Sequence, residues 1–170
     1  MFDIPDKNNM IMAITQGQFN IFSALIMLQE KFGELDEVYL STFNIKDNFI
    51  ISLFKMLESQ KIKKLRIMIS DSISFRMPKR IELLKEKVKE TKKDVILKLN
   101  WNHSKIMLVK VKDIYFCMQG SGNLSDNAQI EQYTIYNNQK IYDFHKNWMD
   151  IEFSRNKKKR EQILKSGENG

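Results

Sequence analysis

Apolar residues in this chain alternate between the spacing of strands and the spacing of helices, and this order limits the folds that the chain can adopt. The first half is predicted to contain a strand at 10–14, a helix at 18–32, a strand at 38–43, a helix at 49–57, a strand at 64–70 and a helix at 78–90. Alternating strands and helices are typical of a parallel or mixed sheet that is covered by helices. The run at 10–14 is predicted to be a buried strand, because it is apolar throughout.

The second half has a different pattern. Four strand-like runs with short connections, at 95–99, 105–109, 114–118 and 132–136, precede a last helix at 141–153. Connections this short cannot hold helical crossovers, so we expect this part of the sheet to be antiparallel. Without an internal repeat or a linker, residues 1–153 are predicted to form a single α/β domain with a mixed β-sheet flanked by helices. Residues 154–170 are predicted to be a basic, flexible tail.

The composition excludes several classes of protein. The single cysteine, Cys117, excludes an internal disulfide and fits a reducing, cytoplasmic location, and its apolar strand predicts that it is buried. The apolar runs are too short to span a bilayer, and the first residues lack a signal-peptide pattern, so no stable membrane association is expected. With two histidines and no carboxylate cluster at ligand spacing, we expect no metal and no other cofactor.

The net charge is positive but unevenly distributed. Lys and Arg number 28 against 21 Asp and Glu, which gives +7, and such an excess favours polyanionic partners such as nucleic acid or an anionic membrane surface. Residues 154–165 hold six basic side chains and one acid, so the other positions carry only about +2. The tail is therefore either a solvated end or a nucleic-acid contact.

Two loops carry the residues best suited to chemistry. His103 and Lys105 lie where a strand begins, and side chains at i and i+2 of a strand point to the same face, so both can approach one anion. In the second loop, Gly120 and Gly122 surround Ser121, and glycines let the backbone come close to a ligand.

The second loop also offers uncharged hydrogen-bond donors. Its backbone N–H groups, the Ser121 hydroxyl and the Asn123 amide suit phosphate oxygens. A hairpin of the strands at 105–109 and 114–118 would return this loop and His103 to the same edge of the sheet. The sequence thus predicts one site for a phosphate group at that edge.

The pattern His103-x-Lys105, followed by Gly120–Ser121–Gly122–Asn123, resembles the signature of the phospholipase D superfamily, the His-Lys-Asp phosphodiesterases. The resemblance is strongest over residues 95–137, and the order of strands and helices agrees with that fold over most of the chain. One motif copy in a short chain is similar to the small nuclease branch found in bacteria and phages, in which two identical chains complete one active site.

This resemblance implies a role for each matching residue. His103 would be the nucleophile that forms a covalent phosphohistidine or, in the partner chain, the general acid for the leaving oxygen. Lys105 would hold a phosphate oxygen, and Ser121 and Asn123 would add hydrogen bonds to the same phosphate. Glu131 matches a downstream acid that orients a histidine in the family.

Other residues depart from the family pattern or flank the motif. The position of the motif's aspartate is occupied by Lys110. Lys110 and Lys112 are predicted to contact a phosphate backbone, and Gly120 and Gly122 to line the substrate. Trp101 either stacks on a base or packs over the site.

The remaining histidine and several phenylalanines are expected to have structural roles. His145 is predicted to be a packing residue of the last helix, and a role as the intrachain partner of His103 is less favoured. The phenylalanines expected in the core are Phe43, Phe54, Phe75 and Phe116.

The sequence favours a metal-independent phosphodiesterase, a nuclease that cuts DNA or RNA in a homodimer with both His103 side chains near a two-fold axis. A catalytically inactive nucleic-acid-binding or phage-associated protein of the same fold is one alternative. A phospholipid phosphodiesterase is another, and it should show an exposed apolar lip or an amphipathic membrane helix.

Overall fold

The computed structural model describes residues 4–17, 19–125 and 129–155. In chain order these residues form β1 (Met10–Gln16), α1 (Ile21–Phe32), β2 (Leu35–Thr42), α2 (Asp47–Glu58), β3 (Ile62–Ser70), α3 (Ile73–Arg76), α4 (Pro78–Glu90), β4 (Asp94–Asn100), β5 (Ile106–Val111), β6 (Ile114–Gly120), β7 (Ile130–Asn137) and α5 (Gln139–Ser154). Every predicted strand and helix is confirmed, and the short helix α3 was not predicted. The predicted basic tail lies, apart from its first two residues, outside the described part of the chain.

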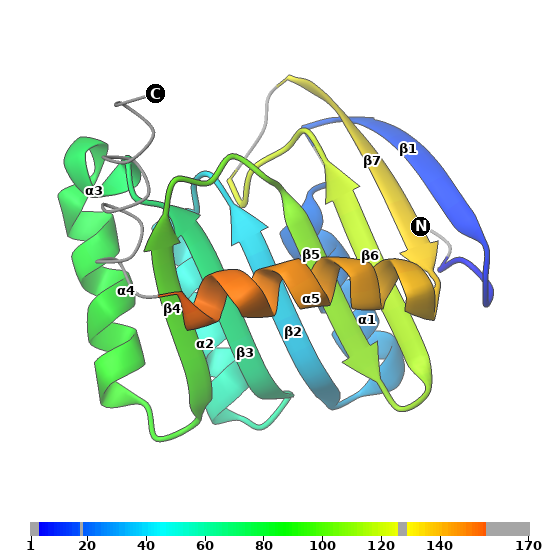
Figure 1. Cartoon of the computed structure of the whole chain (residues 1–170), viewed down its shortest axis with the longest axis horizontal. Helices are drawn as coiled ribbons and strands as arrows, with labels where there is room; N and C mark the ends of the chain where they lie inside the picture. The colour runs from blue at the N-terminus through cyan, green and yellow to red at the C-terminus, as the bar shows by residue number, and fades with distance from the viewer. Residues whose placement is uncertain (1–3, 18, 126–128, 156–170) are drawn as a thin grey trace, which may run out of the picture.

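The seven strands form one mixed sheet with the order β1-β7-β6-β5-β2-β3-β4 (Figure 1). Strands β2, β3 and β4 are parallel, as expected for strands joined by helical crossovers. Strand β5 is antiparallel to β2, and the pairs β5–β6, β6–β7 and β1–β7 are also antiparallel. The predicted α/β fold with a mixed sheet, parallel in its first half and antiparallel in its second, is therefore confirmed.

Strand β1 corrects the prediction of a buried strand at 10–14. It lies at the edge of the sheet, and the side chains of Met10, Met12 and Ile14 are exposed, Ile14 to 81%. The alternate residues Ile11 and Ala13 are more covered. The sequence failed here because an unbroken apolar run has no polar alternation that would reveal a strand with one covered face.

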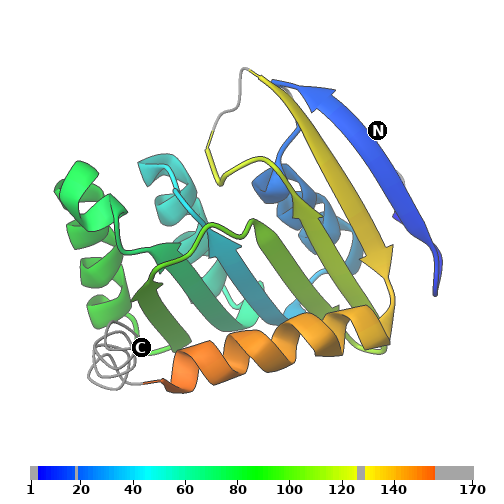
Figure 2. The ribbon, with the colours of Figure 1, turned by 45° about the horizontal axis from the view of Figure 1, so that its top comes forward.

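Helices cover both faces of the sheet. Helices α1, α2 and α4 lie on one face, and α5 crosses the other (Figure 2). Leu25 of α1, Leu53 of α2 and Leu84 of α4 are fully buried in one apolar cluster with the sheet. On the α5 face, Tyr142 packs with Cys117. Burial raises the pKa of the Cys117 thiol to about 12. None of the described helices is long and apolar enough to cross a membrane.

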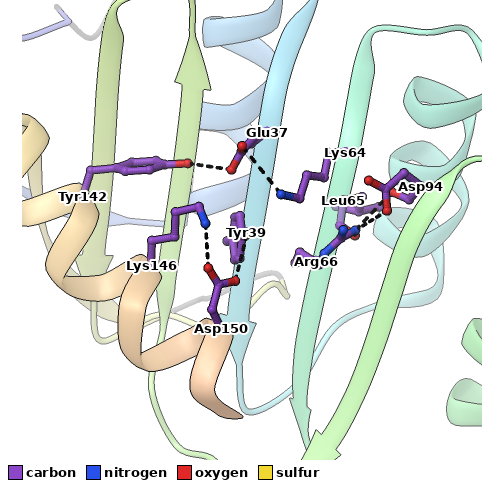
Figure 3. A network of polar contacts seen from close by, with 9 residues as sticks. All are labelled: Glu37, Tyr39, Lys64, Leu65, Arg66, Asp94, Tyr142, Lys146 and Asp150. Carbon is purple, nitrogen blue, oxygen red and sulfur yellow. Dashed lines mark hydrogen bonds and ion pairs between the residues drawn. The ribbon is translucent and has the colours of Figure 1, made fainter. Parts of the chain in front are cut away.

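A polar network anchors α5 to the centre of the sheet (Figure 3). The Tyr39 hydroxyl of β2 donates to Asp150 at 2.9 Å, and the Lys146 ammonium lies 2.6 Å from the other oxygen of that carboxylate. Tyr142 donates to Glu37 at 3.4 Å. Burial, together with the hydrogen bond to Asp150, raises the pKa of Tyr39 to about 12. These charged groups are paired with one another, which indicates a structural role.

Local signals in the sequence explain where helices begin and end. Asn20 caps α1 by accepting a hydrogen bond from Ser23 N at 3.0 Å, and Asn138 caps α5 in the same way through Ile141 N at 3.2 Å. Gly33 ends α1 with a φ of 79°, a conformation that glycine adopts without strain.

Candidate active site

The two loops that carry the motif lie at the same edge of the sheet. Strands β5 and β6 form the predicted hairpin, in which Ile106 pairs with Gln119. Directly beyond this pair, Gly120 N donates to the carbonyl oxygen of Lys105 at 3.2 Å. The loop at 101–105 and the loop at 121–125 therefore begin side by side, which confirms the predicted convergence.

His103 and Lys105 form a close pair. The Lys105 ammonium lies 3.1 Å from Nδ1 and 3.3 Å from Nε2 of the imidazole, and it donates to the His103 carbonyl oxygen at 2.9 Å. His103 is exposed, whereas Lys105 is only 8% exposed. Burial lowers the pKa of Lys105, and the negative charge of Glu131 opposes that effect. The pair thus presents an accessible imidazole beside a partly desolvated cation, which strengthens its interaction with an anion.

An aromatic ring, that of Phe43, contacts the His103 imidazole. The ring centroids of Phe43 and His103 are 5.3 Å apart, and the Arg76 guanidinium lies 5.9 Å from the Phe43 ring centroid. Phe43 itself is partly buried and packs against the core. Phe75 is 89% exposed, so the expectation that Phe75 belongs to the core is wrong. Phe75 lies on α3, a single turn at the edge of the sheet, and its side chain stays in solvent.

A network of small polar residues fixes the first loop. Asn102 Nδ2 donates to Ser41 Oγ at 3.0 Å and to the Thr42 carbonyl oxygen at 3.2 Å. Its Oδ1 accepts from Ser104 N at 3.0 Å, and the hydroxyls of Ser41 and Ser104 hydrogen bond to each other. These positioning residues were not predicted from the sequence. The signal was present in Ser41 and Thr42, two hydroxyl residues that follow the apolar run 38–40 at the carboxyl end of β2, where ligands bind in α/β sheets.

The second loop is tied to the start of β7. The Ser121 hydroxyl donates to the Glu131 carboxylate and accepts from Gln132 N at 3.1 Å. Glu131 was expected to orient a histidine, but the structure gives it Ser121 as its hydrogen-bond partner and Lys105 as a nearby cation. In this arrangement Ser121 can turn to a phosphate only by releasing Glu131.

The same loop is packed closely at both ends. A Cβ on Gly120 would lie 2.3 Å from the Gln132 carbonyl oxygen and 2.4 Å from the Tyr133 ring, so only glycine fits without a shift of the strands. At the other end, Leu124 N donates to Thr42 Oγ1 at 3.3 Å. The loop therefore lies close against the strand ends, and Gly122 is buried within it.

Asn123 lies in this loop, and the environment of its side-chain oxygen is unusual. Its Oδ1 is buried and has no hydrogen-bond partner among the described residues. Buried polar atoms are almost always paired in native proteins, so an orphan of this kind next to Ser121 marks a place that is not optimised for stability alone.

Lys110 and Lys112 do not lie at this site, and their predicted proximity to the motif is wrong. Strand β5 carries Lys110 roughly 16 Å along its length from Lys105, toward the opposite edge of the sheet. There Lys110 lies over the Tyr115 ring, and Lys112 N donates to Asp36 at 2.8 Å. The prediction relied on closeness in sequence, but residues at the two ends of an extended strand lie far apart.

The two remaining predicted residues have clear placements. Trp101 is 78% exposed, so it does not pack over the site. His145 is half-buried on α5, where it accepts a hydrogen bond from Trp148 Nε1 at 3.1 Å and its ring lies 5.1 Å from that of Phe144. Its predicted packing role is confirmed. In the described part of the chain, no three His, Cys, Asp or Glu residues are grouped in a way that could hold a metal ion.

Comparison with known proteins gives structural matches only. No family model and no curated protein matches the chain. The structure is similar to NucT from Helicobacter pylori, with a TM-score of 0.55 and 14% identity over 85% of this chain and 96% of NucT. It is also similar to phosphatidylserine synthase from Haemophilus influenzae, with a TM-score of 0.56 and 14% identity over 86% of this chain. A third match is TrmBL2, an archaeal chromatin protein, with a TM-score of 0.52 and 12% identity over 82% of this chain.

These proteins differ in how much of their own length the chain covers. The chain spans nearly all of NucT, but only 38% of the phosphatidylserine synthase and 51% of TrmBL2. NucT and the synthase are members of the phospholipase D superfamily. This chain is thus a single α/β domain with the phospholipase D fold, and the resemblance seen in the sequence is confirmed at the level of the fold.

Proposed function

We propose that the protein is a phosphodiesterase of the phospholipase D type that cuts nucleic acid through a phosphohistidine on His103. The observation that carries this proposal is the pairing of the exposed His103 imidazole with the buried Lys105 ammonium, next to the loop of Ser121 and Asn123. An imidazole nucleophile, a cation and uncharged donors around one position are what the displacement at a phosphorus atom requires.

The chemistry proceeds in two displacements. An imidazole nitrogen of His103 attacks phosphorus, the bond from phosphorus to the leaving oxygen breaks, and a second histidine donates a proton to that oxygen. Water then attacks phosphorus, gives its proton to the second histidine, and the phosphorus–nitrogen bond breaks with its electron pair returning to His103. Lys105 stabilises the charge that develops on the phosphoryl oxygens in both steps.

The second histidine must come from a second copy of the chain. His145 is engaged with Trp148 on α5, which lies across a face of the sheet and away from the motif edge. A homodimer with both His103 side chains near its two-fold axis provides the missing acid. This arrangement requires a self-complementary surface close to the motif.

The exposed side chains of β1 and β7 offer such a surface. Met10, Met12 and Ile14 point to the same side of the sheet, and Ile130, which pairs with Gln16, continues the stripe to the residue before Glu131. An apolar stripe of this kind on a sheet edge favours association. We propose a second copy as its occupant, because the stripe begins beside a site that holds only one histidine.

Nucleic acid is the favoured substrate for two reasons. The net charge of +7 favours a polyanion. The single-domain nuclease NucT also corresponds to this chain over 96% of its length, whereas the phospholipid enzyme is much longer.

A second candidate is a nucleic-acid-binding protein that does not cut. Lys110 occupies the motif's aspartate position, and the Ser121 hydroxyl is engaged by Glu131. The similarity to TrmBL2, whose structure is described as showing a novel mode of DNA binding, agrees with this alternative.

Trapping of the covalent intermediate tests the proposal. The protein is incubated with 5′- and 3′-labelled oligonucleotides in the presence of EDTA, quenched at alkaline pH and digested for peptide mapping. We expect an acid-labile phosphoryl group on His103, no adduct in His103→Asn, and an unchanged adduct in the control His145→Asn. Binding of the oligonucleotide without an adduct or product would favour the second candidate. Turnover of phospholipid vesicles but not of oligonucleotides would overturn the choice of substrate.

A further inference from the structure

Two large aromatic side chains are exposed at the motif edge without a packing role. Phe75 and Trp101 are 89% and 78% exposed. Exposure of such rings loses the free energy that burial would provide, so two of them beside one site call for an explanation.

The backbone brings the two aromatic residues to neighbouring loops. Asp71 N donates to the carbonyl oxygen of Asn100 at 2.9 Å, which joins the segment leading into α3 to the residue before Trp101. Trp101 itself is two residues from His103. Both rings therefore stand at the end of the sheet that carries the motif, one on the loop of His103 and one on the next loop along.

The residue after Phe75 brings a cation close to the motif. Arg76 follows Phe75, and its guanidinium lies over the Phe43 ring, which in turn contacts the His103 ring. Arg76 is exposed and has no ion-pair partner in the described part of the chain. A positive charge and the Phe43 ring thus lie close to the imidazole, and the charge comes from α3, the helix that also carries Phe75.

We propose that Trp101 and Phe75 stack on unpaired bases, so that the preferred substrate is single-stranded nucleic acid. This inference rests on the proposed nuclease function and specifies its substrate. Bases offer their faces to a protein only when they are unpaired and unstacked, and stacking on aromatic side chains is how non-specific single-strand binding is achieved. Arg76 supplies the accompanying contact to the phosphate backbone.

Fluorescence of Trp101 provides a direct test of binding. Trp148→Phe leaves Trp101 as the only tryptophan, since the chain has two, and His103→Asn in the same protein prevents cleavage during the titration. The probes are an oligothymidylate, an oligomer of equal length in which the bases are replaced by abasic sites, and a DNA duplex. We expect strong quenching by oligothymidylate and weak quenching by the other two, because only the first combines phosphates with free bases.

Alanine variants measure the contribution of each ring. By anisotropy of a labelled oligothymidylate at fixed salt, Trp101→Ala and Phe75→Ala should each bind about five- to 100-fold more weakly. The matched control is Phe144→Ala, which removes a ring that is 69% exposed on α5. Its affinity should equal that of the wild type.

Three results would overturn the inference. Equal quenching by the abasic oligomer or the duplex would show that bases are not contacted. Affinities of Trp101→Ala and Phe75→Ala equal to that of Phe144→Ala would show that the rings are not used. A blue shift of Trp101 emission with anionic vesicles, without a response to oligothymidylate, would assign the rings to a membrane. Since the binding measurements use a cleavage-deficient protein, failure of the nuclease function would leave their outcome readable.

Discussion

The Lys105 ammonium lies 3.1 Å from Nδ1 of His103 while remaining almost wholly shielded from solvent. A lysine held in this way is a poor choice for stability, because burial disfavours its charged form. The arrangement therefore favours a role in binding or catalysis.

Replacement of Lys105 separates its effect on stability from its effect on activity. Lys105→Met keeps the aliphatic volume and removes the buried charge, so we expect a melting temperature equal to or above that of the wild type. Cleavage should fall about 10²–10³-fold, the usual effect of losing one charge-stabilising donor. Calorimetry and initial rates on an oligonucleotide measure the two effects. A clear loss of stability with unchanged activity would contradict a functional role.

Glu131 should set the alkaline limit of activity. Its negative charge raises the pKa of Lys105 against the effect of burial. Glu131→Gln removes that charge, so Lys105 should lose its proton at lower pH and the alkaline limb of kcat/KM should move to lower pH. The control Glu34→Gln removes a carboxylate that pairs with Lys63 near the start of β2, and its pH profile should match the wild type. Identical profiles for both variants would exclude the proposed coupling.

Gly120 should be intolerant of any side chain. Gly120→Ala places a Cβ against the Gln132 carbonyl oxygen and the Tyr133 ring, and forced overpacking of this kind typically destabilises by about 1–3 kcal/mol. For a domain of this size that is a decrease of at least about 2 °C in melting temperature. Gly33→Ala is the comparison, since its Cβ meets open space and only its positive φ is strained. We expect a loss of about 1–2 kcal/mol there; a loss at Gly33 larger than that at Gly120 would contradict the close approach at Gly120.

The anchor of α5 should affect stability at high pH and leave catalysis unchanged. Because the pKa of Tyr39 is raised to about 12 in the folded state, the unfolded chain loses that proton first as the pH rises above 10. Stability should therefore fall between pH 10 and 12, and Tyr39→Phe should remove this component of the decrease. At neutral pH the variant should lose about 1 kcal/mol with its hydrogen bond. Urea titrations at several pH values provide the measurement, and a parallel loss of cleavage rate would show that α5 has a further role.

Subunit mixing tests whether each site needs two histidines. After exchange of equal amounts of wild type and His103→Asn, about a quarter of the dimers carry two intact chains, so activity should fall to about half of that given by the wild type alone. Ile14→Arg should dissociate the dimer and abolish cleavage, which light scattering and rate measurements follow together. Activity that is simply proportional to the wild-type chain would mean that one histidine is sufficient.

The sequence was most informative where local patterns decide the structure. The helix and strand order, the hairpin and the convergence of the loops at 101–105 and 121–125 followed from periodicity and from the length of the connections. What it could not provide were contacts between distant segments, such as Ser41 with Ser104 or Arg76 with Phe43, because these depend on how the strands are ordered in the sheet. Lys110 was misplaced for a related reason, since neighbours in sequence can stand at opposite ends of a strand.

Strand β1 has a consequence for shortened forms of the protein. It pairs along β7, the strand that begins with Ile130 and Glu131, and thereby covers the backbone groups of that strand. A chain cut after Gln16 would leave the backbone groups of β7 on that side unpaired beside the candidate active site, open to strands from other molecules. Such truncation should turn the proposed dimer into growing polymers.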